Sequence, residues 1–126
     1  MELLFVKQND INELCAAINK GMYIQSFHWE REYSIEEDRM QDNLTMSFSP
    51  EIDYYGEKIL KVKFYDVENL VCDDIFKCIS RPVITINDIS AQGYETIRYF
   101  VDEAENMFYF YCNDIEYHWE EQKFEA

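Results

Sequence analysis

The chain has 126 residues, of which 48% are hydrophobic and 17% aromatic, so it holds enough core-forming side chains to fold as one domain over residues 1–126. Its 11 basic and 26 acidic side chains give a formal net charge of −15, and a field of that sign repels nucleic acid and anionic lipid. We therefore expect no nucleic-acid or membrane partner and instead a basic protein, whose encounter the field accelerates, although solubility alone also accounts for the charge.

The opening segment MELLFV predicts a short strand and not a secretory signal. Glu2 stands where a signal peptide carries positive charge, and polar residues follow from Lys7 onward. No later apolar run approaches the ~20 residues that a helix needs to cross a bilayer. We therefore expect a protein of the cytoplasm.

The cysteines support the same compartment. They form no C-x-x-C pair, and each lies in an apolar pattern, where a free thiol behaves as a small hydrophobic side chain. The sequence favours free thiols in a reducing cytoplasm and leaves two disulfides open. The four residues are Cys15, Cys72, Cys78 and Cys112.

Residues 10–20 carry the one clear helical period. Four apolar side chains follow one another at spacings i, i+3, i+4 and i+7, namely Ile11, Leu14, Cys15 and Ile18. Asp10 and Glu13 are spaced as a variant of the capping box, and Gly21 is a suitable residue at the C-terminal end. We expect one amphipathic helix here.

The remainder of the chain predicts strands. Stretches rich in Tyr, Phe, Ile and Val alternate with period two and are separated by polar clusters, at 22–33, 43–49, 58–67, 82–89, 96–102 and 107–119. The fold class is therefore α+β: an antiparallel sheet of about five to seven strands, with the helix at about 10–20 packed on it. We expect Trp29 and Trp119 on the buried side of this sheet.

Each tryptophan belongs to a His-Trp-Glu triplet inside a predicted strand. Side chains alternate between the two faces of a strand, so the tryptophans point inward and the imidazoles join carboxylates outside. If the two strands were neighbours, two nitrogens and two oxygens would be available to Zn²⁺, from His28, Glu30, His118 and Glu120. The simpler interpretation is a solvent-facing histidine beside a glutamate in each strand, and we expect no bound metal.

The last predicted strand, 107–119, changes its inward face near Asn113-Asp114. Apolar residues occupy one parity before this point and the other parity after it, which a bulge or bend would explain. Tyr109 and Tyr111 then stand on the face opposite the apolar residues. Tyrosine buries a large area with little entropy to lose, so both are candidate partner contacts, unless a second layer covers that face.

The usual catalytic patterns are missing from the sequence. Three glycines are too few for a phosphate-cradling loop, and neither G-x-S-x-G nor H-E-x-x-H occurs. Cys15 lies on the apolar helix stripe, where a thiolate is disfavoured. Neighbouring carboxylates such as Asp73-Asp74 point apart in a strand or turn. We expect no enzymatic activity, no catalytic residue and no cofactor.

Two segments carry a family resemblance. VKFYDVENLVCDD (62–74) and ITINDISAQGYETIRYFVDEAENMFYFYCNDIEYHW (84–119) combine a lysine-flanked strand ending in F-Y-D-V-x-x-L, a strand with N-D-I-S, and a hairpin ending in F-Y-C-x-D-I-E. These features resemble small bacterial immunity proteins, which are encoded beside contact-dependent or polymorphic toxins and neutralise them by direct binding. The resemblance implies a non-enzymatic inhibitor whose acidic surface covers the active site of a cationic toxin, often a nuclease.

Two classes of function follow. The first is an acidic binding protein of the immunity type. The alternative is a small metal- or ligand-binding domain that uses His28 and His118, or a regulatory subunit of a larger assembly. For the first class we expect the contact surface to come mainly from the central turn and the last hairpin: Asp66, Glu68, Asp73, Asp74, Tyr109, Tyr111 and Glu116.

Overall fold

The computed structural model describes residues 4–5, 8–50, 58–72, 82–93, 97–105 and 107–121. Within these ranges the chain forms one α-helix, one short 3₁₀ helix and nine strands. In order they are β1 (Leu4–Phe5), α1 (Gln8–Ile18), β2 (Tyr23–Ser34), β3 (Arg39–Ser49), β4 (Lys58–Tyr65), β5 (Glu68–Cys72), β6 (Ile84–Asp88), the 3₁₀ helix (Ser90–Gln92), β7 (Tyr99–Glu103), β8 (Phe108–Cys112) and β9 (Asp114–Glu121).

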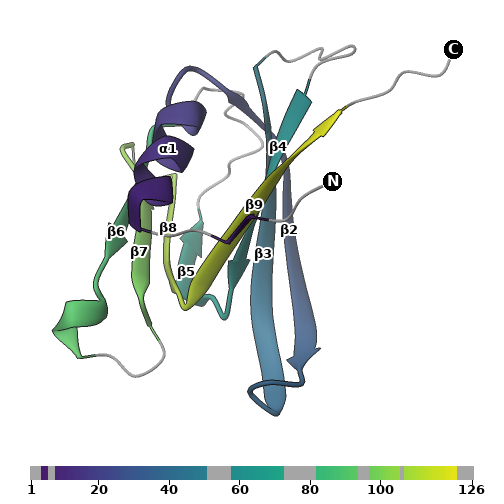
Figure 1. Ribbon diagram of the computed structural model, residues 1–126, viewed down its shortest axis with the longest axis vertical. Coiled ribbons are helices and arrows are strands. Elements are labelled where there is room, and N and C mark those ends of the chain that lie inside the picture. The colour runs from purple at the N-terminus through teal and green to yellow at the C-terminus, as the bar shows by residue number, and fades with distance from the viewer. Residues whose placement is uncertain are drawn as a thin grey trace, which may run out of the picture.

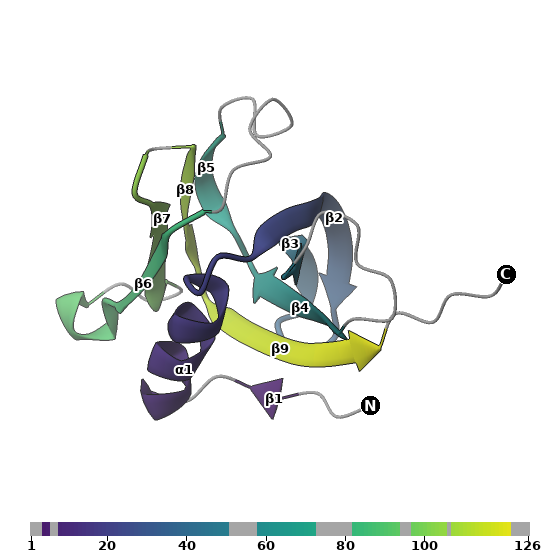
Figure 2. The ribbon, with the colours of Figure 1, turned by 90° about the horizontal axis from the view of Figure 1, so that it is seen from above.

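The strands form two antiparallel sheets. One has five strands in the order β1-β9-β4-β3-β2, and the other has four in the order β5-β8-β7-β6. The chain passes from the larger sheet to the smaller between β4 and β5, and it returns at Asn113 between β8 and β9. Seen from above, the two sheets stand at an angle, and α1 lies between β6 of one sheet and β9 of the other (Figures 1 and 2).

The core lies between the two sheets and the helix. The expected apolar stripe of α1 faces it, since Leu14 and Ile18 are almost fully buried. Across the centre, the rings of Phe64 on β4 and Phe110 on β8 meet edge to face, with 4.9 Å between their centroids. One continuous set of buried side chains therefore joins α1 to both sheets.

The α+β class, the N-terminal helix and the predominance of antiparallel strands are confirmed. The sequence missed β5, because Asn69 has a left-handed φ of 55° and the pairing register shifts between Glu68 and Val71, which breaks the period-two pattern. The switch of the inward face at Asn113-Asp114 is also confirmed. Its cause is the passage from one sheet to the other, so Phe110 and Ile115 are both buried although their parities differ.

The expected burial of the two tryptophans is wrong. Trp29 and Trp119 are each 41% exposed. Both lie on the face that carries the core, because Trp29 is opposite Leu44 and Trp119 is opposite Leu60. However, β2 and β3 have 12 and 11 residues, whereas every strand of the smaller sheet has five. The smaller sheet therefore leaves parts of this face uncovered.

Among the described residues, no helix is long and apolar enough to cross a membrane.

Candidate functional site

The outer face of the four-stranded sheet carries an exposed aromatic cluster. In β8, the side chains of Phe108 and Phe110 are fully buried, whereas those of Tyr109 and Tyr111 point away from the core. The Phe100 ring on β7 lies 4.8 Å from the Tyr111 ring and 6.3 Å from the Tyr109 ring, centroid to centroid. On the other side, β5 places Val71 opposite Tyr109. We call these four residues the aromatic face: Val71, Phe100, Tyr109 and Tyr111.

The aromatic face is open to solvent and has an acidic edge. Val71 is 47% exposed and Tyr109 is 36% exposed, so the described part of the chain forms no second layer over them. Glu68 is opposite Tyr111 in the sheet, and Asp102 is opposite Tyr109. The Oδ1 atom of Asp102 is buried and has no hydrogen-bond partner in the described ranges. Three residues expected from the sequence, Glu68, Tyr109 and Tyr111, are thus brought together here.

Two other expected contact residues are buried and engaged inside the protein. The Asp66 carboxylate accepts hydrogen bonds from both terminal nitrogens of Arg39, and the Asp66 backbone N–H donates to Asn43 at 2.9 Å. The Glu116 carboxylate accepts a hydrogen bond from the Tyr65 hydroxyl. Burial and this contact raise the pKa of Tyr65 well above its usual range. Asp66 and Glu116 are only 6% and 7% exposed, and Asp73 and Asp74 lie outside the described residues.

The outer face of the five-stranded sheet is polar and cross-linked by charge. The Lys63 ammonium on β4 lies 2.8 Å from the Glu32 carboxylate on β2, and the Lys61 ammonium lies 3.1 Å from Glu120 on β9. The hydrogen bond from His118 and then the nearby Lys61 lower the pKa of Glu120. Lysines in the central strand β4 therefore hold acids of β2 and β9 in place.

The structure does not assemble the four-residue metal set that the sequence suggested. His28 is on β2 and His118 is on β9, and β3 and β4 lie between them. Three strand spacings amount to about 14 Å, far beyond the reach of one Zn²⁺. Each imidazole instead faces the glutamate two positions later, at 3.7 Å for His28 and 3.0 Å for His118. Within the described ranges, no group of three or more His, Cys, Asp or Glu residues is arranged to hold a metal.

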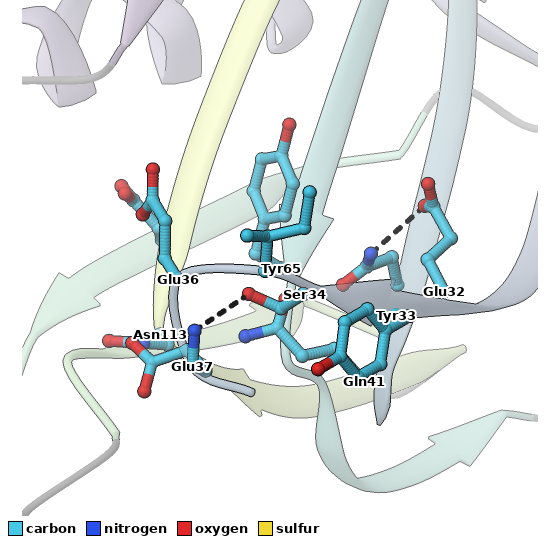
Figure 3. Close-up of a pocket in the computed structure, with 11 residues that line it drawn as sticks. Glu32, Tyr33, Ser34, Glu36, Glu37, Gln41, Tyr65 and Asn113 are labelled. Atoms are coloured by element: carbon cyan, nitrogen blue, oxygen red, sulfur yellow. Dashed lines mark hydrogen bonds between the residues drawn. The ribbon is translucent and has the colours of Figure 1, made fainter. Parts of the chain in front are cut away.

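A pocket of about 400 Å³ opens beside the β2–β3 hairpin (Figure 3). In the view of Figure 3, Glu36 and Glu37 of the turn lie to one side and Glu32 to the other, with Tyr65 between them. Residues of the β8–β9 junction complete the wall. The lining consists of Glu32, Tyr33, Ser34, Ile35, Glu36, Glu37, Gln41, Asn43, Tyr65, Asn113 and Asp114.

The cysteines provide no reactive pair in the described residues. Cys15, Cys72 and Cys112 are not joined in disulfides, and Cys78 lies outside the described ranges. Burial raises the pKa of the Cys15 and Cys112 thiols. Neither is therefore suited to act as a thiolate nucleophile at neutral pH.

The family model of the immunity protein PIM8 matches residues 6–118. The chain belongs to this family. The matched region includes α1 and all strands from β2 to β8, so it extends the resemblance seen in 62–74 and 84–119 through the first half of the chain. No curated protein and no solved structure matches significantly.

Sequence reasoning missed two parts of these surfaces. Phe100 could have been found, because it alternates with Tyr99 and Val101 in a predicted strand. The pocket carried no such signal, since its walls come from residues 32–43, 65 and 113–114. Only the path of the chain between the two sheets brings them together.

Proposed function

We propose that the protein neutralises a cognate toxin in the cytoplasm by direct binding, without catalysis, and that the toxin is a basic protein, such as a nuclease. The observation that carries this proposal is the family match over residues 6–118. The net charge of −15 supports a cationic partner, because complementary charge accelerates encounter and disfavours other partners.

We further propose that the aromatic face is a contact surface for the toxin. Aromatic side chains at the centre with acids at the edge are the arrangement typical of protein interfaces. Here Tyr109 and Tyr111 are at the centre and Glu68 is at the edge. Asp66 and Glu116 would support this surface indirectly, by holding the fold in shape, because Arg39 and Tyr65 already bind their carboxylates inside the protein.

Co-expression with the product of the neighbouring gene tests the neutralisation. The two proteins should co-purify, and cells that produce the neighbouring protein should survive only when the present chain is produced with it. If no complex forms and the cells gain no protection, the proposed function is wrong.

Alanine substitutions test the surface. Tyr109→Ala should weaken binding by roughly 2 kcal/mol, which is about thirtyfold in Kd. Trp29→Ala is the matched control, because Trp29 is a comparably exposed aromatic residue on the other sheet. Protection with normal affinity in Tyr109→Ala and Tyr111→Ala variants would place the interface elsewhere and leave the inhibitory role intact.

A further inference from the structure

The carboxylate of Asp102 lacks a partner for one of its oxygens. Among the described residues, its Oδ1 atom is the one buried side-chain oxygen or nitrogen without a hydrogen-bond partner. Asp102 lies in β7, directly opposite Thr85 of β6 and Tyr109 of β8, and neither hydroxyl group bonds to this oxygen. A buried oxygen of a carboxylate is costly when it is left unpaired. The stability of the isolated chain therefore does not account for an acid at this position.

Other buried carboxylates show how the fold normally treats such groups. The carboxylate of Asp66 is bound by Arg39. Glu103, the next residue after Asp102, accepts hydrogen bonds from three backbone N–H groups. Glu103 points into the core, whereas Asp102 points to the outer face of the four-stranded sheet. Because this face turns away from the larger sheet (Figure 2), the missing partner can come from another molecule.

The rings of the aromatic face lie beside Asp102. Phe100 precedes it by two positions on β7 and points to the same face, and its ring lies 6.3 Å from the Tyr109 ring, centroid to centroid. Residues directly opposite each other in an antiparallel pair have Cβ atoms about 5 Å apart, so a group that touches the Asp102 carboxylate also reaches the Tyr109 ring. Tyr109 is 36% exposed and Asp102 is only partly buried, which leaves both accessible from solvent.

We propose that Asp102 and Tyr109 together bind an arginine side chain of the toxin. The proposal rests on the proposed function and names the chemical group that the aromatic face recognises. A guanidinium group donates hydrogen bonds in its plane to a carboxylate, while its flat face stacks on an aromatic ring. The charge of Asp102 is shared by its two oxygens, so a cation bound from the solvent side also offsets the charge on the buried oxygen.

The site favours arginine over an apolar side chain and over lysine. An apolar side chain packed on Tyr109 would bury the Asp102 carboxylate more deeply and leave its charge uncompensated. The ammonium group of lysine is strongly hydrated and has no flat face to lay on a ring. A guanidinium group is planar and more weakly hydrated, so it can serve the ring and the carboxylate at the same time.

A small probe tests the site without the toxin. Isotope-labelled protein is titrated with N-acetylarginine amide, and backbone amide shifts are followed by NMR. Shifts should concentrate at Phe100, Asp102 and Tyr109, with a Kd of about 1–10 mM for a ligand of this size. N-acetylcitrulline amide has nearly the same shape without the charge, and it and N-acetyllysine amide should bind more weakly. Equal binding of either control, or no shifts with the arginine probe, would overturn the proposal.

Two variants sharpen the test. Asp102→Asn keeps the shape of the side chain and removes its charge, so it should weaken binding of the arginine probe at least about tenfold. Tyr109→Leu keeps an apolar side chain and removes the ring, which should weaken binding about threefold to fivefold. Glu30→Gln, an exposed change on the larger sheet, is the matched control because it alters the net charge by the same unit, and it should bind the probe as the native protein does.

Stability distinguishes a binding role of Asp102 from a structural one. The urea midpoint of unfolding of Asp102→Asn should be equal to that of the native protein or higher, because a neutral amide costs less to bury than an unpaired charge. A lower midpoint would show that the carboxylate serves the fold. That result, or unchanged binding of the arginine probe by this variant, would overturn the proposal.

The toxin experiment separates this inference from the proposed function. The product of the neighbouring gene should bind Asp102→Asn at least about tenfold more weakly than the native protein. If it binds both equally while Tyr109→Ala weakens binding, the aromatic face is the interface but takes no arginine at Asp102, so this inference fails and the proposed function stands. If it does not bind the native protein, the proposed function fails, and the toxin's arginine fails with it even where the probe binds at Asp102.

Discussion

Glu103 shows how a single buried acid fixes the turns around the four-stranded sheet. It is 2% exposed, and its two carboxylate oxygens accept backbone hydrogen bonds from three residues of nearby turns. The distances are 3.1 Å to the Val83 nitrogen, 2.7 Å to the Glu105 nitrogen and 3.4 Å to the Met107 nitrogen. All three N–H groups donate to one carboxylate. The Glu103 side chain therefore takes the place of the backbone carbonyls that would accept these hydrogen bonds if the β-strands were longer.

We expect Glu103→Ala to destabilise the protein by about 3 kcal/mol, because it leaves buried N–H groups without an acceptor. The urea midpoint of unfolding, followed by circular dichroism, measures the loss. Glu105→Ala is the control, since Glu105 is exposed and its backbone N–H would keep its bond to Glu103. Equal midpoints for the two variants would mean that the turns do not depend on the buried carboxylate.

At the scale of elements, Asn19 joins α1 to the edge of the four-stranded sheet. It follows the last helical residue, and its amide nitrogen donates to the Ile84 carbonyl at 2.9 Å while its oxygen accepts from the Ile84 N–H at 2.8 Å. Ile84 belongs to β6, the edge strand of that sheet. One amide side chain therefore takes the position of a neighbouring strand and also protects the edge from pairing with another chain.

Asn19→Ala should cost roughly 2 kcal/mol, since both polar groups of a buried edge residue lose their partner. Hydrogen exchange at the Ile84 amide should accelerate in this variant more than exchange at the centre of β8. Asn12→Ala, an exposed change on the same helix, controls for helix propensity. Unchanged protection of Ile84 in Asn19→Ala would show that β6 is held by β7 alone.

The elements also show what local pattern can and cannot reveal. The helix stripe and the alternation of Leu60, Val62 and Phe64 predicted α1 and β4, because burial on one face leaves its period in the sequence. Asn19, the residue directly after the helix, carries no sequence pattern that indicates a contact with a residue 65 positions away. The same holds for the tryptophans: their faces were predicted, but how far the opposing sheet extends was not.

The candidate surfaces also combine features that a local sequence pattern predicts with features that depend on contacts between distant segments. Tyr109 and Tyr111 were predicted to face outward from the parity of their own strand, and they do. Asp66 looked like an exposed turn acid, but Arg39, which is distant in sequence, binds it. A side chain's partner across the fold depends on strand order, and strand order depends on the total packing of all elements.

At the scale of the whole molecule, we expect the excess of acidic side chains to govern association with the proposed basic toxin. Of the 26 acids and 11 bases, several pair within the polar face and at Asp66, as the Lys61, Lys63 and Arg39 contacts show. The opposite charges of such a pair largely cancel, so the pair adds little to the electrostatic field at long range. The net charge of −15 comes from the acids that exceed the available cations, and a field of that size acts over a Debye length of about 10 Å at 0.1 M salt.

We expect this field to appear in the rate of complex formation. Between about 20 mM and 200 mM salt the association rate constant with the neighbouring gene product should fall at least about tenfold. The dissociation rate constant should change much less, because it depends on short-range contacts such as those of Tyr109. Stopped-flow mixing at a series of salt concentrations separates the two constants.

Two substitutions separate long-range attraction from close contact in that measurement. Tyr109→Ala should raise the dissociation rate constant and leave the salt dependence of association unchanged, because it removes contact area and no charge. Replacing Glu68 with Lys changes the net charge by two units at the edge of the aromatic face, so it should slow association at low salt and flatten its salt dependence. An association rate that is the same at all salt concentrations would show that the acidity serves solubility and that the toxin is recognised by contact alone.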